Sequence, residues 1–335
     1  MTARRLLAPL VVALATVAAL LAPTAPAEAA APPYVALGDS YSSGTGTRSY
    51  INDGTSCQRS VYAYPSLLAS QKGYALNFRA CSGARISDVT NNQLGALSSA
   101  TRYVTISVGG NDAGFADVLT ECATPWWAGD CNGAIDDAQA FINNTLPGRL
   151  STLYASISSR APYARVVVVG YPRIFNGEDC NALTWFSPEE EARLNATADL
   201  LNSKLSAAAS ARGFGFANPT SRFIGHAVCD DPEWINGLSN PISESYHPKV
   251  VGHSSGYAPT VSPLLTGAPA RVTPGVLADA RSSADALAAQ QRQYADADRA
   301  IRPEVVRVPD VTSPAFRRAA REHGIDYGKW LARNT

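Results

Sequence analysis

Four short stretches, far apart in the chain, carry side chains that together could perform acyl transfer. They are GDSY at 38–41, CSGA at 81–84, GGND at 109–112 and ESYHP at 244–248. Ser40 could act as a nucleophile, with His247 as the base that takes its proton and later protonates the leaving alcohol. The backbone N–H groups of Ser40 and Gly83 and the side-chain amide of Asn111 could stabilise the oxyanion. The sequence therefore predicts an acyl-transfer site built from separate loops.

Each of these residues also has a simpler interpretation. Gly-Asp-Ser and Gly-Asn-Asp are ordinary turn sequences, so neither motif is decisive alone. Three other histidines, His226, His253 and His323, compete for the role of base. Only His247 is followed at once by a proline, a residue that often begins a helix. We therefore assign the base to His247.

The segments between these motifs predict a sheet that could bring them together. Strand-like apolar runs are followed by helix-like segments, and this alternation indicates a parallel sheet with helices on both faces. The expected strands cover 34–38, 74–80, 103–109, 164–170 and 213–218, and the expected helices 62–71, 135–160 and 188–211. Ser40 then follows the first strand and Asn111 the third. Ligands of such sheets bind beyond the carboxyl ends of the strands.

The first thirty residues have the features of a secretory signal. Two arginines precede an apolar run over 6–21, and an Ala27-x-Ala29 pattern supplies a cleavage signal. That run is short and alanine-rich, and no later segment reaches the length of a membrane span, so we expect an exported protein without a transmembrane segment. The chain has 28 basic and 28 acidic residues. Such balance gives no reason to expect nucleic-acid binding.

All six cysteines follow the signal: Cys57, Cys81, Cys122, Cys131, Cys180 and Cys229. An even number in an exported chain indicates three disulfides. Fifteen pairings are possible, and we expect the sequential one, 57–81, 122–131 and 180–229. No pair has the C-x-x-C spacing of a zinc site. A metal cluster of His226, Asp230 and His247 is the remaining alternative, and we expect neither metal nor cofactor.

The four motifs, with Ser40, Gly83, Asn111 and His247 in this order, resemble those of the GDSL or SGNH hydrolases. The resemblance covers about residues 33–265 and is strongest to secreted actinobacterial lipases, esterases and phospholipases. It implies an α/β fold of the flavodoxin-like SGNH type, with three α/β/α layers around a central parallel five-stranded sheet. It also implies a serine ester hydrolase whose oxyanion hole consists of Ser40, Gly83 and Asn111.

One position departs from the family pattern. The family usually has an aspartate three residues before the histidine, where this chain has Glu244. Glu244 could orient the imidazole through Nδ1, although its longer side chain changes the reach. Alternatively, the backbone carbonyl of Ser245 accepts that hydrogen bond and leaves a Ser–His dyad. Both alternatives remain open.

The expected substrate is a lipid acyl ester. A phospholipase A-type activity and a carbohydrate acetyl esterase are alternatives, and a secreted surface-binding protein on the same scaffold is an alternative of another class. The early position of the nucleophile in the chain disfavours an α/β-hydrolase lipase. Trp126 and Trp127 lie between two cysteines, where they could pack the loop or form an apolar rim for a lipid surface. We expect a monomer.

We divide the chain into a signal (1–30), a catalytic domain (31–265), and a linker with a helical C-terminal extension (266–335). Apolar residues from Leu277 to Ile301 form one stripe at helical spacing, which Gln291 and Asp298 interrupt. This pattern favours a helix that lies against the domain or a partner. A second helix is expected over 316–324. We expect ester hydrolysis not to need the extension, because the strands, cysteines and motifs precede it.

Overall fold

A computed structural model describes residues 30–334; the expected signal lies almost wholly outside the described residues. Five parallel strands form one sheet in the order β2-β1-β3-β4-β5. This confirms the predicted fold. The strands are β1 Pro33–Gly38, β2 Ala75–Phe78, β3 Tyr103–Ser107, β4 Arg165–Val169 and β5 Gly215–Ala217. Val167 and Val168 in β4 are completely buried, as expected for a strand covered on both faces.

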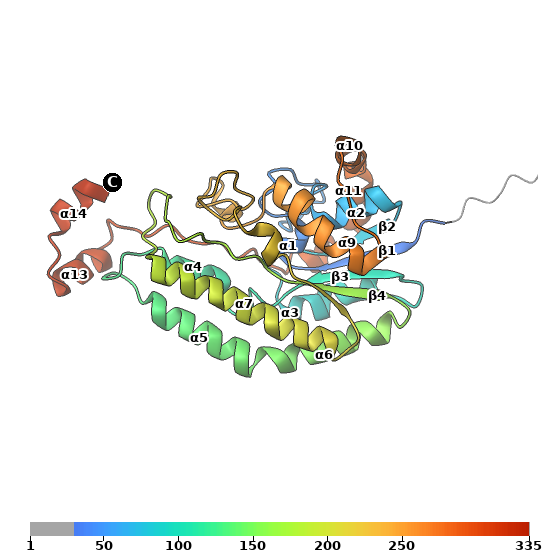
Figure 1. Ribbon diagram of the computed structural model, residues 1–335, viewed down its shortest axis with the longest axis horizontal. Helices are drawn as coiled ribbons and strands as arrows, with labels where there is room; N and C mark the ends of the chain where they lie inside the picture. The colour runs from blue at the N-terminus through green and yellow to red at the C-terminus, as the bar shows by residue number, and fades with distance from the viewer. Residues whose placement is uncertain (1–29, 335) are drawn as a thin grey trace, which may run out of the picture. The chain divides into compact units, whose positions relative to one another are not determined.

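Helices cover both faces of the sheet (Figure 1). One face carries α2 (Tyr64–Lys72) and α9 (Ala258–Thr266), and the other carries α4 (Phe115–Cys122), α5 (Cys131–Asn144), α6 (Leu146–Arg160) and α7 (Pro188–Ser210). Short helical turns complete this part: α1 Ser40–Ser43, α3 Ile86–Asp88, η1 Val89–Gln93, η2 Leu94–Ala96, α8 Thr220–Phe223, η3 Ile242–Glu244 and η4 Gly252–Tyr257.

Two details of the helices bear on the sequence predictions. The expected helix 135–160 is two helices, because Pro147 lies in the first turn of α6, where a proline suits a helix start but not a helix interior. The helix α7 begins as predicted, with a capping box between Ser187 and Glu190. The helix α4, which follows the Asn111 motif, was not predicted.

The C-terminal extension packs against the sheet domain. Its helices are α10 Pro274–Ser282, α11 Ala284–Arg292, α12 Ala295–Asp298, α13 Pro314–Glu322 and α14 Tyr327–Asn334. The helix α10 contacts α2, and α11 contacts β2. The two polar residues that interrupt the predicted stripe, Gln291 and Asp298, are completely buried. That hydrolysis does not need the extension stays a prediction, and these contacts argue against it.

Three disulfides tie the loops: Cys57–Cys81, Cys122–Cys131 and Cys180–Cys229. This is the sequential pairing. Between residues 30 and 334, no helix combines the length and the apolar character needed to cross a bilayer.

Candidate active site

Ser40 lies at the turn that follows β1, and this turn depends on close contact with β3. A Cβ atom on Gly38 would lie only 2.2 Å from the carbonyl oxygen of Ser107, so the two strands can meet here only with glycine. Asp39 caps the short helix α1 by accepting a hydrogen bond from the N–H of Tyr41 at 3.1 Å. Ser40 begins that helix and is 5% exposed.

His247 lies beside Ser40 and is held by a backbone carbonyl. Its Nε2 is 2.8 Å from Ser40 Oγ, and its Nδ1 is 2.9 Å from the carbonyl oxygen of Ser245. A carbonyl can only accept, so Nδ1 carries the proton and Nε2 is free to accept one from Ser40. Burial lowers the pKa of His247 to about 4, although the hydrogen bond to Ser245 opposes this shift. The imidazole is therefore neutral at neutral pH, with Nε2 unprotonated.

Glu244 makes other contacts. Its buried carboxylate accepts hydrogen bonds from Tyr50 Oη at 2.6 Å and from Arg48 Nε at 3.1 Å. The turn between Glu244 and His247 passes through Tyr246, which has a φ of 61°. Of the two alternatives for the Nδ1 partner, the geometry matches the Ser245 carbonyl and not Glu244.

The other two motifs form a second side of the site. Asn111 Nδ2 donates to the carbonyl oxygen of Ala84 at 3.0 Å, which leaves its second hydrogen for another acceptor. Asp112, the next residue, accepts a hydrogen bond from the N–H of Ile86 at 3.0 Å. The loop with Gly83 and the loop with Asn111 are thus fastened to each other next to Ser40.

Asp39 supports the site through buried hydrogen bonds. Tyr171 Oη donates to its carboxylate at 2.5 Å and Ser107 Oγ at 2.8 Å. Burial raises the pKa of Asp39 to about 6, and the hydrogen bonds from Tyr171, Ser107 and Tyr41 oppose that shift. The sequence analysis missed Tyr171 and Ser107. The available signal was their position at the carboxyl ends of β4 and β3, the edge at which Ser40 lies.

An apolar cavity opens at Ser40 and extends between α4, α5 and α7. Ser40 and Asn111 supply polar groups at its start, and most of the remaining wall is aliphatic or aromatic. That part of the wall consists of Tyr41, Ala113, Phe115, Val118, Leu119, Ala138, Ile142, Tyr171, Pro172, Ile174, Phe175, Leu194, Ala198 and Leu201. The cavity therefore suits a hydrocarbon chain attached to a group at Ser40.

The remaining histidines have other surroundings. His226 stacks on Trp234, and its Nδ1 is 2.8 Å from the carbonyl oxygen of Pro232. His253 is completely buried, and burial lowers its pKa to about 3. Within residues 30–334, no three side chains of His, Cys, Asp or Glu are grouped as metal ligands, so the considered set of His226, Asp230 and His247 is not assembled.

The two tryptophans of the loop between α4 and α5 differ in their surroundings. Trp127 is buried and packs edge-on against Phe316 and Trp330 of the extension, with ring centroids 4.6 and 5.2 Å away. Trp126 is 71% exposed, with its ring edge near His323. Trp127 therefore packs the loop, as one alternative expected, but against helices that the sequence analysis did not connect with it.

The Ser40 hydroxyl is hydrogen-bonded to a neutral imidazole at the carboxyl edge of a parallel sheet, in a fold of three α/β/α layers. This combination is typical of serine hydrolases. Residues 36–254 match the family described as GDSL-like lipase/acylhydrolase. The chain belongs to this family, and it is a serine ester hydrolase.

Similar proteins include lipases of Streptomyces. The chain is 45% identical over 237 residues to Lipase 1 of Streptomyces coelicolor, an alignment that covers 70% of this chain and 87% of that protein. The crystal structure of the extracellular lipase of Streptomyces rimosus has a TM-score of 0.65 at 42% identity and covers 69% of this chain and 99% of its own. Phospholipase A1 of Streptomyces albidoflavus has a TM-score of 0.66 at 42% identity, covering 70% and 99%.

Proposed function

We propose that this chain is a secreted hydrolase of lipid acyl esters that works through an acyl-enzyme on Ser40. The observation that carries the proposal is the apolar cavity that begins at Ser40 and Asn111. A long acyl chain needs an apolar channel next to the nucleophile, whereas an acetyl group would leave most of this cavity unfilled. A carbohydrate acetyl esterase is therefore the weaker candidate.

A phospholipase A-type activity is the second candidate. It would use the same acyl cavity and the same nucleophile, and only the alcohol part of the substrate would differ. The similarity to phospholipase A1 of Streptomyces albidoflavus, at 42% identity, favours testing it directly.

The first half of the reaction acylates Ser40. Its Oγ attacks the ester carbonyl carbon while His247 Nε2 takes the hydroxyl proton across their 2.8 Å contact. The carbonyl oxygen becomes an oxyanion, which accepts hydrogen bonds from the N–H groups of Ser40 and Gly83 and from the Asn111 amide. The tetrahedral intermediate then breaks its bond to the alcohol oxygen, which receives the proton from His247.

The second half releases the acid. Water attacks the acyl carbon and gives a proton to His247 Nε2, and the new intermediate expels Ser40 Oγ, which regains that proton. In both halves the imidazole carries a positive charge transiently. The Ser245 carbonyl, 2.9 Å from Nδ1, holds the tautomer and stabilises this charge, so we propose a Ser–His dyad in which Glu244 is a loop residue.

Three further features support secretion and contact with lipid. The disulfides suit an oxidising compartment, and the relative from Streptomyces rimosus is described as extracellular. Trp126 exposes a large aromatic surface, as tryptophans at membrane interfaces do. The monomeric state and the cleavage of residues 1–30 stay predictions.

The test is hydrolysis of a substrate panel by residues 31–335. It contains p-nitrophenyl acetate, butyrate and palmitate, phosphatidylcholine, and an acetylated sugar. We expect the long-chain esters or phosphatidylcholine to be preferred, and Ser40→Ala to be inactive and to lose labelling by a fluorophosphonate probe. A preference for the acetylated sugar, or labelling of another residue, would contradict the proposal.

A pair of variants on α7 tests the cavity itself. Ala198 lines the cavity, whereas Ala196, on the same helix, is exposed. Ala198→Phe should lower kcat/KM for palmitate much more than for acetate, because the added ring occupies the channel. Ala196→Phe should leave both unchanged. Equal effects of the two variants would show that the acyl chain binds elsewhere.

A further inference from the structure

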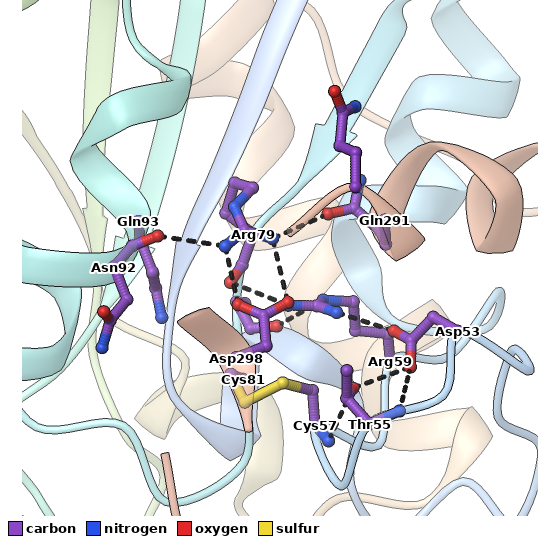
Figure 2. Close-up of polar contacts among 12 residues, drawn as sticks. Asp53, Thr55, Cys57, Arg59, Arg79, Cys81, Asn92, Gln93, Gln291 and Asp298 are labelled. Atoms are coloured by element: carbon purple, nitrogen blue, oxygen red, sulfur yellow. Dashed lines mark hydrogen bonds and ion pairs between the residues drawn. A yellow bond between two sulfur atoms is a disulfide. The ribbon is translucent and has the colours of Figure 1, made fainter. Parts of the chain in front are cut away.

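Beside the loop that carries Gly83, the protein buries a cluster of charged side chains (Figure 2). Arg59 and Arg79 are almost completely buried, as are Asp53 and Asp298. Of these four, only Asp298 comes from the extension, beyond residue 254, where the match to the family ends. We define these four residues as the charge cluster.

Asp298 bridges the two arginines. Its Oδ1 accepts from Arg79 Nη2 at 2.6 Å, and its Oδ2 accepts from Arg59 Nη2 at 2.7 Å and from Arg79 Nη1 at 3.0 Å. Asp53 pairs with the other side of Arg59 at 2.6 Å. Among the described residues, Asp298 is the carboxylate that pairs with Arg79. Without it the cluster would hold one uncompensated buried positive charge, which is strongly unfavourable.

The first arginine fixes the start of the Gly83 loop. Arg59 donates from Nε to the carbonyl oxygen of Ala80 at 2.9 Å and from Nη2 to that of Arg79 at 3.3 Å. The next residue, Cys81, is bridged to Cys57. The backbone just before Gly83 is therefore held by a side chain whose own position depends on Asp53 and Asp298.

The second arginine connects the cluster to the turn of the nucleophile. Arg79 Nη2 donates to the carbonyl oxygen of Asn92 at 3.0 Å. The adjacent Gln93 uses its side-chain amide on both backbone groups of Gly38, at 2.7 and 2.9 Å. Gly38 lies two residues before Ser40. One buried guanidinium thus bonds to the helical turn that holds the end of β1.

The chain beyond Asp298 then crosses the Gly83 loop itself. We call residues 299–304 the strap. A Cβ on Gly83 would lie 2.1 Å from the carbonyl oxygen of Arg302, so the strap packs directly on the glycine backbone. Further along, Glu304 pairs with Arg85 at 2.5 Å. Ile301 is buried against the Cys57–Cys81 bridge.

We propose that Asp298 is a positioning residue, which fixes the Gly83 N–H in the oxyanion hole through Arg59, Arg79 and the strap. The inference rests on the proposed function, in which Gly83 is an oxyanion donor. The Gly83 N–H binds the oxyanion, which forms only after the substrate has bound. The cavity that binds the acyl chain is lined by other residues. Loss of Asp298 should therefore lower kcat and leave KM nearly unchanged.

The test compares Asp298→Asn with Asp296→Asn in the full mature chain, residues 31–335. Asp296 lies on the same short helix, and its fully exposed side chain pairs with Arg299. With p-nitrophenyl butyrate, we expect Asp298→Asn to lower kcat at least about tenfold with KM within about twofold, well below its melting temperature. The Ki of a trifluoromethyl ketone should rise by a similar factor, because its adduct needs the oxyanion hole. Asp296→Asn should match the parent.

A double variant separates positioning from charge balance. Asp298→Asn with Arg79→Gln leaves Arg59 paired with Asp53, so its melting temperature should exceed that of Asp298→Asn, while its kcat should stay low. A folded Asp298→Asn or double variant with parental kcat and Ki would overturn the proposal. If neither folds, Asp298 serves the fold alone and the proposal is equally overturned. Failure of the parent to hydrolyse esters through Ser40 would instead contradict the proposed function.

Discussion

The loop that carries His247 and the loop that carries Gly83 both lie next to Ser40, but different interactions hold them. On the His247 side, Asn236 Nδ2 donates to the carbonyl oxygens of Gly46 and His247, each at 3.0 Å. Tyr41 Oη donates to the carbonyl oxygen of Tyr246 at 2.7 Å. Both of these contacts are neutral, and the buried Glu244 of the same loop pairs with Arg48, whose side chain is 60% exposed. The Gly83 loop depends on the charge cluster and on the strap.

This difference affects how each loop tolerates change. Losing one neutral hydrogen bond costs about 0.5–1.5 kcal/mol in net stability, whereas removing one partner of a buried ion pair costs about 3–5 kcal/mol. The His247 side also lies within the residues that match the family, whereas the Gly83 side takes Asp298 from outside that match. The second loop therefore depends strongly on one residue of the extension.

The largest expected effect is on catalysis, at the His247 loop. His247→Ala should lower kcat by at least about 10⁴-fold, because it removes the base and acid of both half-reactions. The melting temperature should change little, since Asn236 and Tyr41 bind backbone groups that remain. Steady-state kinetics with p-nitrophenyl butyrate and circular dichroism check both expectations. A loss of tenfold or less would contradict the role of His247.

The next effect is on stability, at the charged loop. A chain of residues 31–268 lacks Asp298 and Gln291 and leaves Arg79 without its carboxylate. We expect the free energy of unfolding to fall by about 3–5 kcal/mol, measured by urea unfolding. A chain of residues 31–308 is the control, because it keeps the charge cluster and the strap but lacks α13 and α14. If both chains match the chain of residues 31–335 in stability and kcat, the extension is dispensable, as the sequence alone suggested.

A smaller effect is expected at Glu244. Glu244→Gln keeps an oxygen for Tyr50 and should lower kcat by about tenfold or less, because Ser245 holds the imidazole. Loss of an orienting carboxylate costs about 10⁴-fold in a serine protease, so a loss of that size would establish a triad. Glu233→Gln, at a partly exposed ion pair with Lys249, is the matched control and should be neutral in kinetic assays.

The smallest effect is a shift along the pH axis. Since burial lowers the pKa of His247 from 6.5 to about 4, the acid limb of kcat/KM assigned to this base should lie near pH 4. The unfolded chain binds this proton below pH 6.5 and the folded chain only near pH 4, so His247 lowers stability as pH falls through that window.

Asp39 needs a control in this experiment, because its pKa is raised to about 6. Its contribution to stability is fully present below the unfolded pKa of 3.8 and is lost as pH rises through about 6, opposite in sign to that of His247. An inflection that disappears in Asp39→Asn belongs to Asp39. Rates read at the isosbestic wavelength of p-nitrophenol check this, and an inflection at 6.5 that survives the substitution would contradict the prediction.

The sequence was sufficient to predict the sheet and the proximity of Ser40, Asn111 and His247. Parallel strands place their carboxyl ends at one edge, so motifs that follow β1, β2 and β3 must meet there. The sequence left the hydrogen-bond partner of His247 Nδ1 open. The chain reverses at Tyr246, and no local pattern decides whether the Glu244 side chain points toward the imidazole. The same limit applies to Arg79 and Asp298: each was visible as a polar residue in an apolar pattern, but no local pattern connects them.

The contact between Arg79 and Asp298 also constrains the order in which the chain can finish folding. The two residues are 219 positions apart, and Arg59 and Asp298 are 239 apart. During synthesis, the two arginines beside the Gly83 loop lack this carboxylate until residue 298 has been made. Contacts this distant in sequence are slow to form. Completion of this side of the site is therefore expected to be a late event in the folding of the chain.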